Sequence, residues 1–187
     1  MRKILLLLIL LIPTLSQAQE FNFKSYVDQD VSCFGNNDGT IQSEATPVGK
    51  YMYSISRGTT FKDSNTSGTF YKLEPGTYKS CASDGKTKKC VSLKVTQPKK
   101  LEITFFVDRY PTPGDNTGTL RVNLKGGTTD IQPYLVTWKN SSCKIMNSDD
   151  QMYALELDRL PVDSYIVTIE DDRGCFLTRS YDLIMKK

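Results

Sequence analysis

The sequence lacks histidine altogether and, beyond its first residues, has no long apolar run. Without histidine, the commonest general base, the usual catalytic triads and the usual zinc and copper ligand sets are missing. Carboxylate chemistry and calcium sites built from oxygen ligands remain open. No segment after the N-terminal region is apolar enough to cross a membrane as a helix. We therefore expect a protein that is not an enzyme, with no catalytic residue, metal ligand, cofactor or transmembrane segment.

A net charge of either sign is also nearly absent once the first residues are set aside. The 24 basic and 21 acidic residues become 22 and 21 when Arg2 and Lys3 are removed. No general electrostatic footprint for nucleic acid remains, and we expect no nucleic-acid partner. Lysines do gather locally, at Lys86, Lys88, Lys89, Lys94, Lys99 and Lys100. This cluster fits either contact with an acidic polysaccharide or membrane surface, or protection of an edge strand against unwanted pairing.

The first 18 residues have the three parts of a secretory signal peptide. Arg2 and Lys3 form the basic start, Ile4 to Ile12 the apolar run, and Ser16-Gln17-Ala18 the small-residue cleavage site. Cleavage there leaves 169 residues (187 minus 18). We expect a secreted, periplasmic or cell-surface-associated product, in a compartment where disulfides persist.

The remaining chain is a tandem repeat. Five short segments recur in the same order, at offsets from 79 residues (118 minus 39) to 87 residues (160 minus 73). The pairs are Gly39-Thr40-Ile41 with Gly118-Thr119-Leu120, Tyr51–Ile55 with Tyr134–Trp138, Leu73–Tyr78 with Leu160–Tyr165, Asp84-Gly85 with Asp171-Asp172, and Cys90 with Cys175. We therefore expect two domains, residues 19–98 and 99–187, joined at a linker of residues 96–100.

Each repeat has the pattern of β-strands. Apolar and polar side chains alternate with a period of two, as in Tyr51, Tyr53 and Ile55, and turn clusters rich in Gly, Asn and Asp separate the runs. No stretch after residue 18 has a helical period. The fold class we predict is all-β, with two tandem immunoglobulin-like sandwich domains. Trp138 is expected in the core of the second sandwich rather than as a ligand platform.

One motif supports this fold in particular. In sandwich domains a tyrosine at the start of the sixth strand turns its hydroxyl back onto the upstream backbone, forming a tyrosine corner. Leu73, Gly76 and Tyr78 have this spacing, with the leucine plugging the core and the glycine permitting the tight turn. Leu160 and Tyr165 are the equivalents in the second repeat, with an aspartate in place of the glycine. We expect both tyrosine rings to be buried.

Five cysteines are an odd number, so at least one is free or pairs with another chain. If Gly85-Lys86 is a two-residue hairpin loop, Cys81 and Cys90 face each other at a non-hydrogen-bonded site, where the Cα separation suits a disulfide. A loop at Asp84-Gly85 would shift the register by two and separate them. The rival Cys33–Cys90 bond is disfavoured because the two loops concerned fall at opposite ends of a sandwich. The pairing of Cys33, Cys143 and Cys175 stays open, although Cys143 and Cys175 are not expected to pair with each other.

The first repeat resembles a SprB repeat, a unit found in surface and secreted proteins of the Bacteroidetes. The resemblance covers about residues 25–98 and is carried by Cys33–Ile41, Tyr51–Ile55, Leu73–Tyr78, Asp84–Cys90 and Val95–Pro98. The second repeat is a weaker copy, with Tyr110–Pro113 at its opening but with Asp171–Cys175 retained. The resemblance implies a surface or secreted context and a role in adhesion or display.

We therefore expect a non-catalytic binding, adhesion or structural module with a protein or polysaccharide partner at the cell surface. The alternative is a carbohydrate-binding protein of the cell envelope that uses exposed aromatic rings. The loop Asn36-Asn37-Asp38-Gly39 fits either a calcium site or a tight turn.

Processing gives the first testable prediction. Intact-mass analysis of the exported protein should show a chain that begins at Gln19, because signal peptidase cuts after a small-residue site such as Ser16-Gln17-Ala18. A product in the exported fraction that retains Met1 would contradict it.

Overall fold

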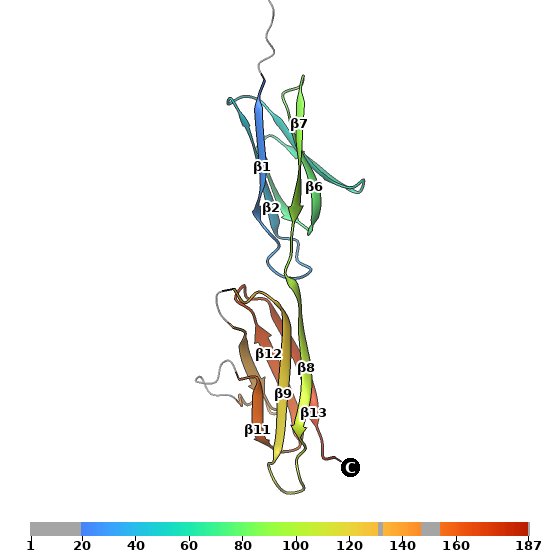
Figure 1. Ribbon diagram of the computed structural model, residues 1–187, viewed down its shortest axis with the longest axis vertical. Coiled ribbons are helices and arrows are strands. Elements are labelled where there is room, and N and C mark those ends of the chain that lie inside the picture. Colours follow the sequence, from blue (N-terminus) through green and yellow to red (C-terminus); the bar gives the residue numbers. More distant parts are fainter. Residues whose placement is uncertain (1–19, 131–132, 147–153, 187) are drawn as a thin grey trace, which may run out of the picture.

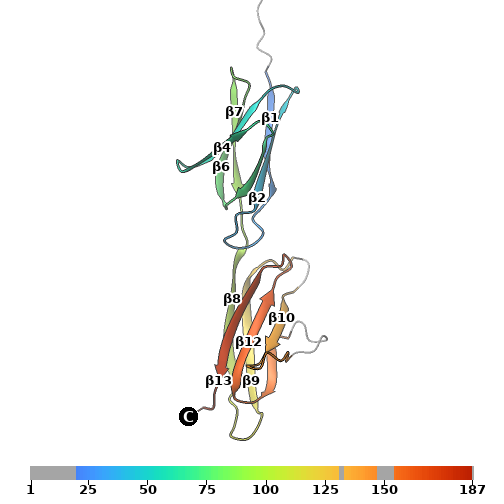
Figure 2. The same cartoon turned by 180° about the vertical axis from the view of Figure 1, so that it is seen from behind.

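The computed structural model describes residues 20–130, 133–146 and 154–186, and the signal-peptide prediction lies outside these ranges. The described residues form thirteen β-strands and no helix. They build two sandwiches stacked end to end, with the C-terminus at the far end of the second (Figure 1, Figure 2). No helix in the described part of the chain is long and apolar enough to cross a membrane.

The first domain consists of seven antiparallel strands in two sheets. One sheet has the order β1-β2-β5, and the other has the order β4-β3-β6-β7. The strands are β1 (Asn22–Gln29), β2 (Gly39–Thr46), β3 (Met52–Arg57), β4 (Phe61–Asn65), β5 (Thr69–Leu73), β6 (Gly76–Ser83) and β7 (Lys88–Val95). This division of consecutive strands between two sheets is that of an immunoglobulin-like sandwich.

The second domain repeats the arrangement with six described strands. Its sheets have the orders β11-β9-β8 and β10-β12-β13, and no sheet combines strands from both domains. The strands are β8 (Lys99–Arg109), β9 (Gly118–Gly127), β10 (Leu135–Lys139), β11 (Glu156–Leu160), β12 (Asp163–Glu170) and β13 (Phe176–Leu183). In the described residues β4 has no counterpart here, and the all-β, immunoglobulin-like fold predicted from the sequence is confirmed.

Each sandwich has its own core. Tyr53 and Ile55 point inward from β3 and join the first core, as their alternation predicts. Trp138 on β10 is fully buried in the second core, and its indole N–H donates to the Ala154 carbonyl at 2.9 Å. The tryptophan is thus a core residue, and its polar atom is satisfied.

Close backbone packing explains why the repeats share a glycine at the start of their second strand. A Cβ on Gly39 would lie 2.9 Å from the Leu73 carbonyl oxygen, and one on Gly118 would lie 2.8 Å from that of Leu160. These glycines pair in register with those leucines. Both leucines are buried, so the glycines let β5 and β11 close over their cores.

Tyrosine corners occur in both domains. The Tyr78 hydroxyl donates to the Glu74 carbonyl at 2.8 Å, and the Tyr165 hydroxyl donates to the Pro161 carbonyl at 3.0 Å. Both rings are buried, and burial raises the pKa of Tyr165 to about 12, with a further contribution from Asp163. The phenols therefore stay protonated, as donors must, throughout the physiological range.

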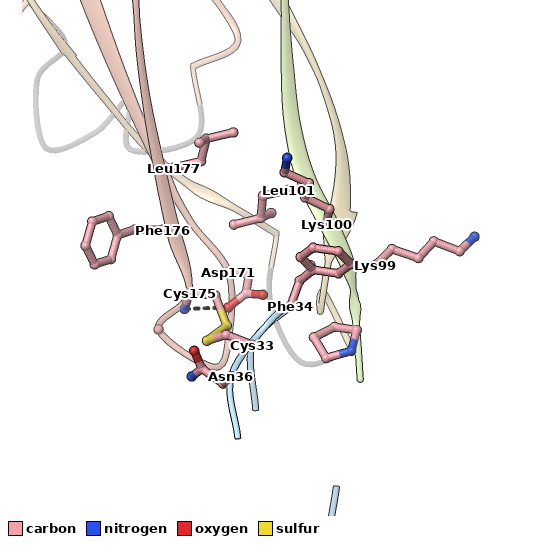
Figure 3. Close-up of a pocket in the computed structure, with 13 residues that line it drawn as sticks. Cys33, Phe34, Asn36, Lys99, Lys100, Leu101, Asp171, Cys175, Phe176 and Leu177 are labelled. Atoms are coloured by element: carbon pink, nitrogen blue, oxygen red, sulfur yellow. Dashed lines mark hydrogen bonds between the residues drawn. A yellow bond between two sulfur atoms is a disulfide. The ribbon is translucent and has the colours of Figure 1, made fainter. Parts of the chain in front are cut away.

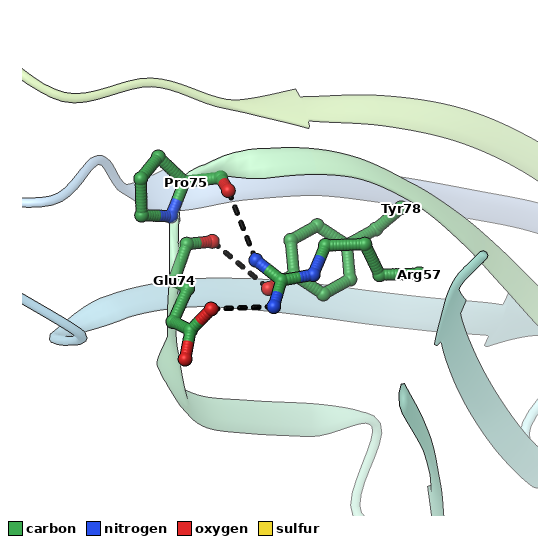
Figure 4. A network of polar contacts seen from close by, with 4 residues as sticks. All are labelled: Arg57, Glu74, Pro75 and Tyr78. Carbon is green, nitrogen blue, oxygen red and sulfur yellow. Dashed lines mark hydrogen bonds and ion pairs between the residues drawn. The ribbon is translucent and has the colours of Figure 1, made fainter. Parts of the chain in front are cut away.

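The tyrosine corner of the first domain also contains the guanidinium group of Arg57 (Figure 4). Arg57 donates to the Pro75 carbonyl at 3.0 Å and pairs with the Glu74 carboxylate at 2.5 Å. A Cβ at Gly76 would lie 2.7 Å from the Arg57 Cδ. The glycine therefore makes room for the arginine as well as for the turn.

Loss of the corner hydrogen bond should be measurable in the first domain. Tyr78→Phe keeps the ring but leaves the Glu74 carbonyl without its donor, so we expect a loss of about 1 kcal/mol in the free energy of unfolding, from urea titration. Tyr71→Phe is the matched control, because the Tyr71 side chain is 68% exposed and lies outside the corner. Equal losses in the two variants would contradict the corner's role.

Candidate functional site: the junction between the domains

The linker between the sandwiches is held by a loop of the first domain. β7 ends at Val95 and β8 begins at Lys99. The loop of residues 30–38, which joins β1 to β2, folds back against this short connection. Hydrogen bonds run from the Val31 N–H to the Thr96 carbonyl at 2.9 Å and from the Thr96 N–H to the Asp30 carboxylate at 2.6 Å. The linker is therefore pinned to the first domain.

The same loop is shaped from within by Asp38. Its carboxylate accepts hydrogen bonds from the backbone N–H of Ser32, at 3.0 Å, and from the Ser32 hydroxyl. The hydroxyl contact is the main reason why the pKa of Asp38 lies below its ordinary value. The carboxylate considered above as a calcium ligand is thus engaged inside a turn. Across residues 20–130, 133–146 and 154–186, no three acidic or cysteine side chains cluster as a metal site would require.

A buried carboxylate shapes the facing loop of the second domain. Asp171, between β12 and β13, is 2% exposed. It accepts hydrogen bonds from the backbone N–H groups of Arg173 and Cys175, at 3.0 and 2.9 Å, and from the backbone N–H and hydroxyl of Thr128, at 2.9 and 3.1 Å. With four donors its charge is well compensated. The loop therefore presents Cys175 in one fixed position.

A disulfide between Cys33 and Cys175 joins the two loops (Figure 3). The partners are 142 residues apart in sequence, and their Cα atoms are 5.7 Å apart. Cys33 belongs to the first domain but packs against the core of the second. The domains are therefore linked twice, once by the polypeptide and once by this bond, which we call the strap.

The pairing of Cys33 with Cys175 is open from the cysteine spacing alone, but strand direction contains a signal for it. The loop after the first strand and the loop before the last strand lie at opposite ends of any one sandwich. In two sandwiches arranged head to tail, the first loop of the leading domain therefore meets the last loop of the following domain. The rule that disfavoured Cys33–Cys90 within one domain favours Cys33–Cys175 across the junction.

Beside the strap lies a cleft of about 470 Å³. Its lining comes from both domains and the linker: Cys33, Phe34, Asn36, Pro98, Lys99, Lys100, Leu101, Gly127, Asp171, Gly174, Cys175, Phe176 and Leu177. Phe34 and Phe176 are 50% and 73% exposed, and Figure 3 shows them on opposite sides of the strap. The cleft is thus lined by apolar side chains from both domains, by one carboxylate, Asp171, and by the linker lysines Lys99 and Lys100.

The site residues predicted from the sequence lie elsewhere. Cys81 and Cys90 form a disulfide, with a Cα separation of 4.0 Å, and they pair in the predicted register. It joins β6 and β7 of the first domain, away from the cleft. The tyrosine corners, with Leu73 and Leu160 buried beside them, are likewise structural. Cys143 is an exposed free thiol.

Comparison with known proteins places the chain in no family. No family model and no curated protein matches it. Among solved structures, similarity extends to three N-terminal domains of the Hoc capsid protein of bacteriophage RB49 (14% identity, TM-score 0.48, 88% of this chain and 59% of that one). The titin I-band fragment I67–I69 (15%, 0.45, 88% and 65%) and a C-terminal fragment of intimin in complex with its receptor's binding domain (12%, 0.44, 87% and 63%) are also similar. The chain thus spans less than two thirds of each.

Peptide mapping without reductant tests the cysteine assignments. We expect linked peptides containing Cys33 with Cys175 and Cys81 with Cys90, while Cys143 is alkylated directly, because the first two pairs lie at bonding distance and the last thiol is exposed. A Cys33 peptide linked to Cys90 or to Cys143 would contradict the strap.

Proposed function

We propose that this protein is an extracellular, non-catalytic module for binding, adhesion or support, in which two sandwiches act as one rigid arm. The observation that carries the proposal is the strap between Cys33 and Cys175. Domains connected by a short linker and a modest interface move relative to each other by default. A second covalent link beside the linker opposes bending there, and a rigid arm can hold its binding surfaces at a fixed distance.

An oxidising compartment is consistent with this proposal. The chain contains two disulfides, and such bonds persist in oxidising compartments but are rare in the reducing cytosol. The resemblance of the first repeat to SprB repeats supports a cell-surface or secreted setting, and a partner that is a protein or a polysaccharide. The absence of histidine and the duplication of a small sandwich count against catalysis.

Sugar binding through a flat row of exposed aromatic rings receives less support. Phe106 and Tyr110 are partly exposed, but cations lie over their faces: Arg121 at 4.9 Å from the first ring centroid and Lys186 at 5.8 Å from the second. Phe34 and Phe176 border the cleft from different domains. These rings form no common platform in the described residues.

Removal of the strap should loosen the arm. We expect Cys33→Ser/Cys175→Ser to broaden the distance distribution from small-angle X-ray scattering and to reduce binding to the surface of the producing cells, because only the linker then joins the domains. The matched control is Cys81→Ser/Cys90→Ser, which removes a disulfide inside one domain.

The two variants separate a rigid arm from general disulfide stabilisation. The control should keep the scattering profile of the unmodified protein. If the strapless variant keeps both that profile and full cell binding, the rigid-arm function is wrong.

A further inference from the structure

The outer face of the four-stranded sheet in the first domain is rich in lysines and hydroxyl groups. Strand register places Ser56 opposite Lys62 on one side and Lys79 on the other, with Ser92 next in the same row. An adjacent row contains Ser64, Ser54, Cys81 and Cys90. Lys88 pairs with Ser83 and Lys94 with Thr77, on the same side of the sheet. We call the surface that carries these four exposed lysines, Lys62, Lys79, Lys88 and Lys94, the lysine face.

Negative charge is scarce on the lysine face. Among the described residues, no ion pair involves any of its four lysines. Asp63 lies nearby, but its register partner is the buried Ile55, so its side chain belongs to the other side of the sheet. Its carboxylate accepts a hydrogen bond from the Ser64 N–H at 2.7 Å. In the described residues the ammonium groups on this face therefore outnumber the one nearby carboxylate and form no ion pair with it.

The opposite sheet of the same domain has a different character. Glu44 lies across from Lys24, and Asp28 is on the same strand. Burial, Glu44 and Asp28 together raise the pKa of the Tyr26 hydroxyl between them. The first domain therefore has one predominantly cationic sheet face and one of mixed charge, and an anionic partner would be oriented toward the first.

The lysine face is also shaped and held rigid. A hollow of about 450 Å³ lies over it, and its lining includes Lys62, Lys79, Lys88, the serines 54, 56 and 64, and one acidic residue, Asp63. Cys81 lines the same hollow, and its disulfide to Cys90 ties β6 to β7 across the middle of the face. The backbone positions of Lys79, Lys88 and Lys94, which lie on these two strands, are thus held at fixed spacing before a partner binds.

Protection of a sheet edge accounts for only part of this surface. Lysines discourage pairing when they lie on edge strands, and β4 and β7 are edges. Lys79, however, is on β6, which has a neighbour on each side. The lysine cluster expected from the sequence is not one surface either: Lys89 lies over the Phe21 ring at 5.4 Å, and Lys99 and Lys100 line the cleft.

We propose that the lysine face binds an anionic polysaccharide, a sugar chain with repeated carboxylate or sulfate groups. Lysines supply point charges for those groups, and short hydroxyl side chains donate to and accept from sugar hydroxyls. A peptide that adds a strand would pair at an edge, β4 or β7, and not on the face itself. The one large apolar side chain of the face is Met52, so the face has no apolar pocket for peptide side chains. The face likewise has no cluster of apolar side chains that could insert into a membrane. The proposal does not depend on the strap or the cleft.

Binding assays on the full exported protein test this site. The probes are polygalacturonate and dextran sulfate, with neutral dextran, polyglutamate and vesicles containing phosphatidylglycerol for comparison. The test variant is Lys62→Gln/Lys79→Gln/Lys94→Gln. The matched control, Lys24→Gln/Lys125→Gln/Lys139→Gln, removes the same charge from exposed positions on other faces. Circular dichroism verifies that both variants fold.

We expect at least one of the two anionic polysaccharides to bind in 50 mM salt and to be released in 0.5 M salt, where exposed charges are screened. The test variant should bind about tenfold more weakly, as for the loss of three exposed ion pairs, and the control should match the unmodified protein. Neutral dextran should not bind. Equal losses in both variants, no polysaccharide binding at low salt, or tighter binding to polyglutamate or vesicles would each overturn the proposal.

Discussion

Alternating strand direction is the constraint on which the rest of this molecule depends. Because neighbouring strands of each sandwich run antiparallel, the loops of each domain divide between its two ends. The loop between β1 and β2 therefore meets the loop between β12 and β13 at the junction (Figure 1). The strap and the cleft between the domains both follow from this meeting of two loops that are far apart in sequence.

The conformation of each of these loops is held by a carboxylate that accepts hydrogen bonds within the loop or from a neighbouring one. Asp171 gathers four donors around one side chain, and Asp38 organises the facing loop through Ser32. A disulfide requires a narrow range of Cα separations between its two cysteines, so conformationally mobile loops would form it less readily. The hydrogen bonds therefore act on the junction indirectly, by presenting Cys33 and Cys175 at a suitable distance.

Features set by local sequence were predicted directly, whereas the strap required the added premise that the two repeats stack head to tail. The Cys81–Cys90 pair follows from the register of one hairpin, and the tyrosine corners follow from a short motif. The strap depends on how one repeat stacks on the next, a relation that periodicity within a repeat does not contain. The lysines were grouped by sequence proximity, but alternation along β7 sends Lys88 and Lys89 to opposite sides of the sheet. Lys62 and Lys79 join Lys88 only through cross-strand pairing.

The position of the strap also determines how the molecule bears tension. A pull applied at β1 and β13 passes from Cys33 directly to Cys175, because the covalent bond is the shortest path between them. The chain between the two cysteines, a separation of 142 residues that includes most of both sandwiches, then bears no force. Their unfolding would otherwise release about 480 Å of extended chain, at roughly 3.4 Å per residue. Under load the protein thus behaves as a short, nearly inextensible tether rather than as two domains that unravel in turn.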